Sequence, residues 1–324
     1  METVHGVLIA LAERYSFGDV AALVAAGADG LTTAEAARVQ KLCKFGQRLL
    51  DLDAEDFGNA DPDAVSTDLR QRALLCRMPQ SPQERLRGAL GSLRPAYALL
   101  LEVIDARWRR QEISALVAAV HIASEYAPLL VWEQVLGHAG DPLKLPQQVG
   151  GKDSVWGDLD DRDCPHTKAE KSAAQRVLRV AQEPPSGWRA YLDRQHSNTS
   201  HALGVCAAGC SRPCSVFTRW DEVQQEVLIR GCRLAQALND SAVVKLRHAA
   251  PVGHGFGVPT RDELLDAWVR SRGTLARYAH QTAADDGFAL PGLPALFSGL
   301  AGSPIHPSTL LRDTSTALIA ALRN

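Results

Sequence analysis

The chain has 324 residues, of which 46% are hydrophobic and 22% are charged, and its formal net charge is −2. This length and apolar content suffice for one large or two ordinary hydrophobic cores, and they exclude wholesale disorder. The near-zero net charge provides no global basic excess for nucleic acid or membranes, so such binding would require a local patch. The first residues lack the basic and apolar regions of a secretory signal, and we expect a cytoplasmic protein with no membrane partner.

The spacing of apolar residues indicates a series of amphipathic helices in the first half of the chain. The third helix begins with Thr32-Thr-Ala-Glu35, a capping box in which the threonine oxygen accepts a backbone hydrogen bond and the glutamate reaches back. We interpret the acidic segment 51–63, which follows it, as a solvated connector. The predicted helices are 2–15, 18–28, 32–50, 64–76, 81–93 and 95–137, the last of them interrupted at 109–111.

The most hydrophobic stretch, 114–132, contains residues that are costly in lipid, namely His121, Glu125 and Pro128. A membrane span of this length would carry few or no such residues. We therefore predict a buried helix, kinked at Pro128, rather than a membrane span.

The second half of the chain is less regular. Gly, Pro, Asp and Gln dominate 139–166, and 196–218 is rich in Cys, Gly and Ser. Segment 242–248 begins with β-branched residues and alternates in polarity, which predicts a strand. The remaining segments with helical spacing are 168–182, 220–238, 260–284 and the tail from 308.

Together these patterns predict a mainly α fold. We expect an irregular helical bundle domain over 1–148 and a linker or ordered loop over 149–166. A smaller α+β region over 167–324 would contain a metal-stabilised Cys/His loop.

The densest cluster of metal-ligating residue types lies between His196 and Cys214, with two histidines and three cysteines in 19 residues. Thiolate and imidazole groups are the ligands that zinc prefers, and four of them close a structural site. Gly204, Gly209 and Pro213 predict a loop rather than a regular helix there. The candidate ligands are Cys164, His166, His196, His201, Cys206, Cys210 and Cys214.

Three interpretations of this cluster compete. The one we favour is a structural zinc ion held by Cys206, Cys210 and Cys214 with a fourth ligand from the other candidates. The second is an iron–sulfur cluster with Cys164 as the fourth thiolate, and the third is a set of ordinary buried cysteines. The surplus of donors and the absence of an H-E-x-x-H motif favour a structural over a catalytic ion.

A glycine-rich segment lies between the predicted strand and the helix that begins at 260. Its candidate phosphate-contacting residues are Gly253, His254, Gly255, Gly257 and Thr260. A strand, a glycine turn and a helix start can hold a phosphate on free backbone amides. The match to known fingerprints is poor, because Val258 stands where a small residue is required and no Walker lysine is present. A tight turn is therefore the simpler interpretation.

A short basic patch surrounds Trp108, and two further basic residues precede the glycine-rich segment. These candidate nucleic-acid contacts are Arg107, Arg109, Arg110, Lys245 and Arg247. Charges on a helix face are most often solvated, which is the simpler interpretation here.

From these features we expect a zinc-stabilised binding or scaffold protein of a multi-component assembly. Its expected partners are other proteins, with nucleic acid as a further candidate. One alternative is a metal-dependent, hydrolase-like enzyme that uses the same Cys/His cluster. The other is a nucleotide- or phosphate-binding regulator that uses the glycine loop at 253–257. The sequence does not decide whether the protein is an enzyme.

Overall fold

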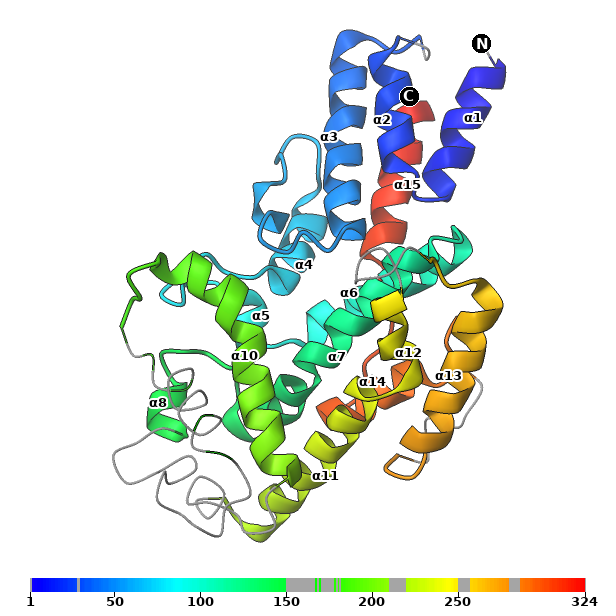
Figure 1. Cartoon of the computed structure of the whole chain (residues 1–324). Helices are drawn as coiled ribbons and strands as arrows, with labels where there is room; N and C mark the ends of the chain where they lie inside the picture. The colour runs from blue at the N-terminus through cyan, green and yellow to red at the C-terminus, as the bar shows by residue number, and fades with distance from the viewer. Residues whose placement is uncertain are drawn as a thin grey trace.

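The computed structural model describes residues 2–27, 30–149, 182–209, 220–249, 257–279 and 286–323, together with 167, 169, 178 and 180. Within these residues the chain forms helices joined by turns and contains no β-strand (Figure 1). The mainly α prediction is confirmed. The helices of the N-terminal part are α1 (Glu2–Glu13), α2 (Phe17–Ala25), α3 (Thr33–Leu50), η1 (Phe57–Asn59), α4 (Thr67–Cys76), α5 (Gly88–Gly91) and α6 (Arg94–Arg109).

The central helix is α7 (Ile113–Leu136), and the remaining helices follow it in the chain. They are α8 (Leu145–Gln148), α10 (Gly187–Gly209), α11 (Glu222–Asn239), α12 (Ala242–Lys245), η3 (Leu246–Ala249), α13 (Arg261–Leu275), α14 (Leu293–Ala301) and α15 (Leu310–Arg323).

The predicted α+β character of the C-terminal region is wrong, because the predicted strand 242–248 folds as α12 and η3. The adjacent residues Val243 and Val244 are both buried, as in a helical turn, whereas a strand would bury alternate residues. The backbone amide of Val243 donates to Ser271 Oγ of α13 at 3.0 Å. Contact with α13 therefore outweighs the β propensity of the valines.

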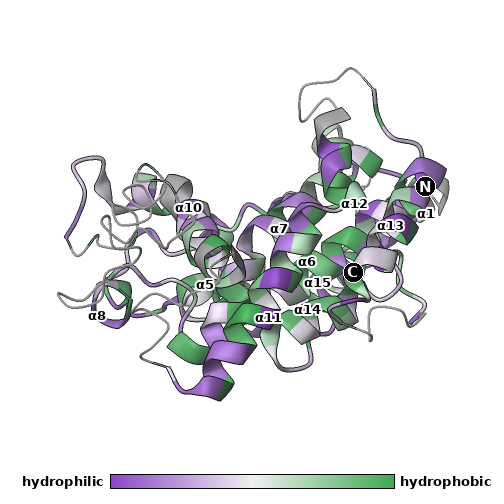
Figure 2. Cartoon of the chain, turned by 60° about the horizontal axis from the view of Figure 1, so that its bottom comes forward, coloured by the Kyte–Doolittle hydropathy of each residue, from purple (hydrophilic) through white to green (hydrophobic). Residues whose placement is uncertain are grey.

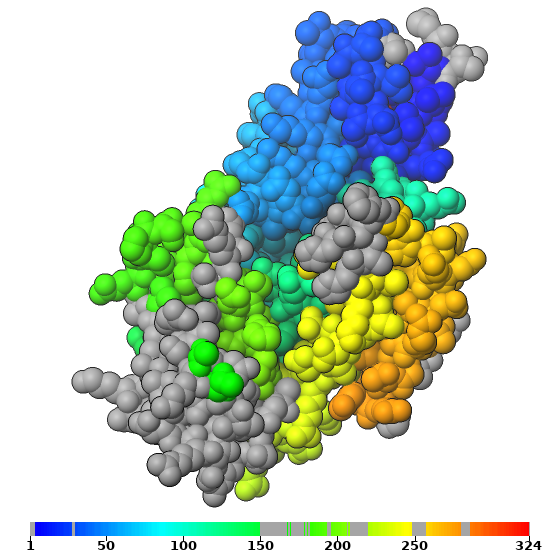
Figure 3. Space-filling view, in the orientation of Figure 1, coloured from blue at the N-terminus to red at the C-terminus, as the bar shows by residue number. Residues whose placement is uncertain are grey.

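The N-terminal helices α1, α2 and α3 pack with the C-terminal helix α15 and form a lobe that projects from the larger body (Figures 1 and 3). The capping box at the start of α3 is confirmed: Glu35 N lies 3.3 Å from Thr32 Oγ1, and Thr32 N lies 2.8 Å from Glu35 Oε2. Burial of Leu8, Val20 and Leu318 holds the lobe together.

The predicted helix 81–93 is wrong except for the short α5. Turns occupy most of 79–87, where Glu84 accepts hydrogen bonds from the backbone amide of Gln80 (2.6 Å) and from the Arg77 guanidinium (3.0 Å). The Glu84 side chain therefore holds this segment as a loop by accepting hydrogen bonds from a nearby backbone amide and from Arg77. The predicted interruption at 109–111 is confirmed, since α6 ends there and Gln111 has a φ of 62°.

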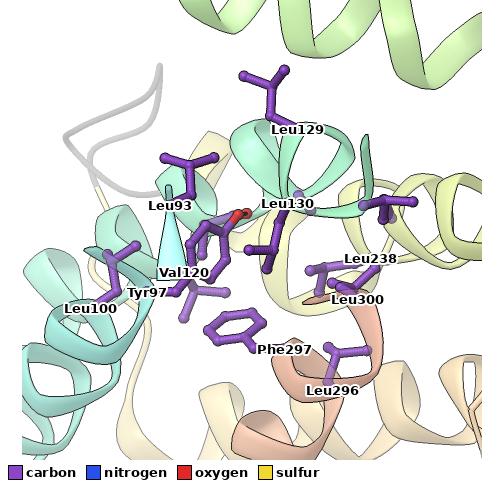
Figure 4. Close-up of a cluster of buried hydrophobic side chains, with 14 of the residues drawn as sticks. Leu93, Tyr97, Leu100, Val120, Leu129, Leu130, Leu238, Leu296, Phe297 and Leu300 are labelled. Atoms are coloured by element: carbon purple, nitrogen blue, oxygen red, sulfur yellow. Dashed lines mark hydrogen bonds between the residues drawn. The ribbon is translucent and has the colours of Figure 1, made fainter. Parts of the chain in front are cut away.

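Helix α7 forms the centre of the larger hydrophobic core, as the buried-helix prediction expected. Among the described helices it alone has the length and composition of a membrane span, and α6, α10, α11 and α14 pack against it. Figure 4 shows Tyr97, Leu130 and Phe297 in this core, with the rings of Tyr97 and Phe297 edge to face at 4.9 Å between centroids. Hydrophobic residues also run along α11 and α14 near the middle of the molecule (Figure 2).

Residues on both sides of the predicted domain boundary at 148 share this larger core. It draws on Tyr97 and Trp132 before the boundary and on Leu203, Leu228 and Trp268 after it. The indole Nε1 of Trp132 donates to the carbonyl oxygen of Leu203 at 3.2 Å. The core that positions the candidate site is therefore assembled from segments that are distant in the chain.

Candidate functional site

Helix α10 carries three of the candidate metal ligands, and Cys164, His166, Cys210 and Cys214 lie outside the described residues. The prediction of an irregular loop from residue 196 onward is wrong as far as Gly209, because α10 runs through this segment. Gly204 allows close helix packing instead of a turn: a Cβ atom there would lie 2.8 Å from Pro128 Cγ of α7. The side chain of Cys206 is not among those described.

His196 and His201 do not converge on one point. The His196 side chain is 1% exposed, and its Nε2 donates to the Ala139 carbonyl oxygen at 2.8 Å. Burial lowers the pKa of His196 to about 4, so the ring is neutral and fastens α10 to the turn after α7. His201 is exposed. The described part of the chain contains no group of three His, Cys, Asp or Glu side chains that could hold a metal ion.

The glycine-rich segment is described only from Gly257 onward, so Gly253, His254 and Gly255 lie outside the described residues. Thr260 caps α13: its Oγ1 accepts from Glu263 N at 3.2 Å, and the Glu263 carboxylate accepts from Thr260 N at 2.8 Å. The Glu263 carboxylate thus occupies a backbone amide at the start of the helix. It also places a negative charge where a phosphate would bind, which disfavours phosphate binding there. The hydroxyl of Thr260 therefore has a structural partner.

The arginines around Trp108 join helices. Arg107 donates to the Leu50 carbonyl oxygen at 3.0 Å and to Asp51 Oδ1 at 2.7 Å, which ties α6 to the end of α3. Arg110 donates to Glu112 Oε1 at 2.7 Å and to the Arg14 carbonyl oxygen at 3.1 Å.

The third arginine of this patch, Arg109, is exposed and pairs with Asp105 at 2.6 Å. Trp108 itself lies under the guanidinium of Arg261, whose Cζ is 3.9 Å from the ring centroid. Each arginine of the patch therefore has an acceptor of this chain beside it, and the Trp108 ring faces Arg261.

Lys245 lies instead at a polar pocket between α7, α10, α11 and α12, with a volume of about 410 Å³, and Arg247 contacts His121 of the same pocket without lining it. Lys245 and His201 line it, and neither side chain has an ion pair or hydrogen bond among the described residues. The other polar side chains that line the pocket belong to His121, Ser124, Glu125, Ser197, Asn198, Gln236, Asn239 and Asp240.

One wall of the pocket holds a histidine–carboxylate pair. His121 and Glu125 are one helical turn apart on α7, and His121 Nε2 lies 3.0 Å from Glu125 Oε1. The Arg247 guanidinium contacts the same imidazole nitrogen. The hydrogen bond from His121 keeps the pKa of Glu125 below its ordinary value, with a smaller contribution from Arg247, so this carboxylate stays charged at neutral pH.

Further hydrogen bonds fix polar side chains of α7 and of the end of α11 at the pocket. Ser124 Oγ, which is 2% exposed, donates to the His121 carbonyl oxygen at 2.7 Å and lies 3.4 Å from Asn239 Oδ1. Gln236 Nε2 donates to Asp240 Oδ2 at 2.9 Å. The pocket therefore combines fixed polar groups, including the carboxylates of Glu125 and Asp240, with two basic side chains that have no partner within the described part of the chain, a combination that suits a polar ligand with a negatively charged group.

Sequence reasoning selected His201, Lys245 and Arg247 for two different sites, and it considered His121 and Glu125 only as residues that are costly in lipid. The available signal was the spacing of His121 and Glu125, because a histidine and a glutamate four residues apart on an apolar helix share one face. The partners on α10, α11 and α12 have no sequence signal, since they come together only by packing.

No protein-family model matches this chain, and neither a curated protein nor a solved structure does. The fold and the site thus define only a general class: a mainly helical protein with a polar pocket at the junction of four helices.

Proposed function

We propose that this chain is a binding protein that takes a small phosphorylated ligand, such as a nucleotide or a sugar phosphate, in the pocket between α7, α10, α11 and α12. The observation that carries this proposal is that Lys245 and His201 line a pocket of about 410 Å³ and have no ion pair or hydrogen bond with any residue that the structure describes. This volume lies within the range of small-molecule sites. The sequence analysis gave a phosphate-binding regulator that uses the glycine loop at 253–257 as one alternative. The present proposal keeps that class of ligand but puts it in the pocket beside α12.

The charges of the pocket narrow the ligand class. The Lys245 ammonium would bind the phosphate as a compact point charge, and Arg247 adds positive potential behind His121. Glu125 and Asp240 also line the pocket, and their carboxylates disfavour a ligand that is only anionic. The same carboxylates accept hydrogen bonds from hydroxyl groups, so a phosphate attached to a sugar fits better than inorganic phosphate.

Titration calorimetry on the full chain tests this proposal with AMP and ribose 5-phosphate against adenosine, ribose and inorganic phosphate. We expect the phosphorylated sugars to bind more tightly than either component alone. The variant Lys245→Gln should weaken their binding by at least about tenfold, since a hydrogen bond to a charged group contributes roughly 1.5–3 kcal/mol. Binding of adenosine should change little, because it has no phosphate.

Lys44→Gln is the matched control, because Lys44 is an exposed lysine of α3 that does not line the pocket. It should leave every affinity unchanged. The proposal would be contradicted if phosphorylated sugars failed to bind at millimolar concentration. Equal losses of affinity in the two lysine variants would contradict it as well.

A zinc-stabilised scaffold is the second proposal. It is supported by the spacing of Cys206, Cys210 and Cys214 and by the chemistry of thiolate ligands. Metal analysis of the purified protein should then find about one equivalent of zinc, and Cys210→Ser should lower folding stability as the metal is lost. A folded, metal-free protein would contradict it, and a brown protein would indicate an iron–sulfur cluster. Protein partners, nucleic acid and a cytoplasmic location belong to this proposal.

A further inference from the structure

A second pocket, of about 300 Å³, lies where the loop after α3 meets α6, α7 and α10. It shares no lining residue with the polar pocket. Its walls are mostly apolar and come from both hydrophobic cores. The apolar side chains that line it belong to Leu52, Phe57, Met78, Leu93, Tyr97, Leu99, Leu100, Ile122, Tyr126 and Leu192.

Three of these residues are Leu93, which precedes α6, and Tyr97 and Leu100 within it (Figure 4). The hydroxyl of Tyr97 donates to the Ala123 carbonyl oxygen at 2.6 Å, so Tyr97 offers the pocket only its ring. Ile122 is 37% exposed, which is unusual for a residue of the central helix and leaves apolar surface open to solvent at the pocket. Burial of this surface would favour an apolar ligand.

Two carboxylates also line this pocket, and they differ in their partners. Glu55 pairs with Arg189 of α10 at 2.6 Å. Asp53 is exposed, and its carboxylate has no ion pair or hydrogen bond with the rest of the described chain. Desolvation and the negative charge of Asp56 raise the pKa of Asp53 and outweigh the opposing effect of Arg48, so a further positive charge near this carboxylate would favour its charged form.

We propose that this apolar pocket binds a small hydrophobic cation, such as an alkylamine or an arylalkylamine. The hydrocarbon part would lie against Leu100, Ile122 and Tyr126, and the ammonium group would pair with Asp53. The aromatic rings of the wall also attract cations. An amphiphilic anion with the same hydrocarbon part would meet the carboxylates of Asp53 and Glu55 and bind weakly.

Calorimetric titration of the full chain with octylammonium, octanol and octanoate at neutral pH separates charge from burial, because the three share one hydrocarbon chain. We expect octylammonium to bind most tightly, octanol less tightly and octanoate at least about tenfold more weakly than the amine. Octanoate that binds as tightly as octylammonium would overturn the proposal.

Asp53→Asn tests the ammonium contact, and this exposed position should tolerate the change. Octylammonium should bind about fivefold more weakly, as expected for a partly exposed ion pair, while octanol should be unaffected. The control Asp63→Asn removes the same charge from the same acidic loop but lies outside the pocket, and it should have no effect. Equal effects of the two variants on octylammonium binding would also overturn the proposal.

Ala96→Trp tests the cavity itself, since half-buried Ala96 of α6 lines it and a tryptophan would fill it. Binding of octylammonium and octanol should then fall together, with the helical circular dichroism unchanged. If a folded Ala96→Trp variant bound octylammonium and octanol as tightly as the wild type, these ligands would bind elsewhere and the proposed pocket would be wrong.

Discussion

Glu102 lies under the N-terminus of α15, where its carboxylate accepts from the amides of Leu311 (3.1 Å) and Arg312 (3.0 Å). The side chain is 8% exposed. Burial, which penalises the charged form, raises the pKa of Glu102 to about 7 and outweighs the two amide hydrogen bonds, which favour that form. A single residue of α6 therefore couples the attachment of α15 to pH.

The sign of this coupling follows from the proton count. Between the ordinary pKa of 4.5 and the folded value of about 7, the folded protein holds the proton and the unfolded chain has lost it. Stability contributed by Glu102 is therefore present at low pH and is lost as pH rises through this window. Glu102→Gln should remove that dependence and be more stable than the wild type at pH 8, by on the order of 2 kcal/mol.

Urea unfolding of both proteins from pH 4.5 to 8 checks this prediction. The control Glu226→Gln changes an exposed glutamate of α11 and should follow the wild-type profile. Parallel profiles for Glu102→Gln and the wild type would contradict it.

Two helices approach α7 closely, each through a glycine. A Cβ atom on Gly204 of α10 would lie 2.8 Å from Pro128 Cγ, and one on Gly231 of α11 would lie 2.5 Å from Val131 Cγ1. Contacts this short force neighbouring atoms to move, so both positions require the absence of a side chain. Glycine in a helix costs about 1 kcal/mol relative to alanine, and the close packing offsets this cost.

Gly204→Ala should therefore destabilise the protein by about 1–3 kcal/mol despite the better helix propensity of alanine. The matched control is Gly273→Ala in α13, where a Cβ would meet nothing within 4 Å, and this variant should gain roughly 0.5–1 kcal/mol. Urea unfolding of both variants measures the difference. A stabilised Gly204→Ala protein would show that α10 does not pack on α7 in this way.

Helix prediction succeeded where the signal is local. The capping boxes at Thr32 and Thr260 and the break at Gln111 depend on residues within a few positions of one another. It failed at 242–248 and at 196–209, because contacts with Ser271 and Pro128 come from other helices and outweigh propensity. The glycine at 204 was interpreted as a helix breaker because the sequence does not reveal which helix faces it.

At the scale of the whole molecule, the last helix completes the N-terminal lobe. Leu311 and Leu318 of α15 are buried in the core that also contains Leu8 and Leu49. Ser315 Oγ donates to the Ala12 carbonyl oxygen of α1 at 2.8 Å. Segments from the two halves of the sequence are thus required for one core.

A chain that ends at residue 309 should therefore lose the fold of α1 to α3 as well as α15. The truncation removes four buried leucines, Leu310, Leu311, Leu318 and Leu322. Each buried leucine contributes roughly 1.5–3 kcal/mol, so together they contribute an amount comparable with the whole stability of a domain. Circular dichroism and limited proteolysis should show lost helix and new cleavage within residues 2–50. The control chain that ends at residue 323 should behave as the full chain, and a protease-resistant N-terminal lobe in the shorter chain would contradict this prediction.

Local patterns in the sequence alone determined that the chain is mainly helical, where several helices begin and end, and that 114–132 is buried. Only the tertiary structure decided which helices meet, and with them the pocket where His121, His201 and Lys245 lie together. The physical reason is range: hydrogen-bond caps and helical periodicity act over a few residues, whereas a pocket depends on the packing of side chains from distant segments.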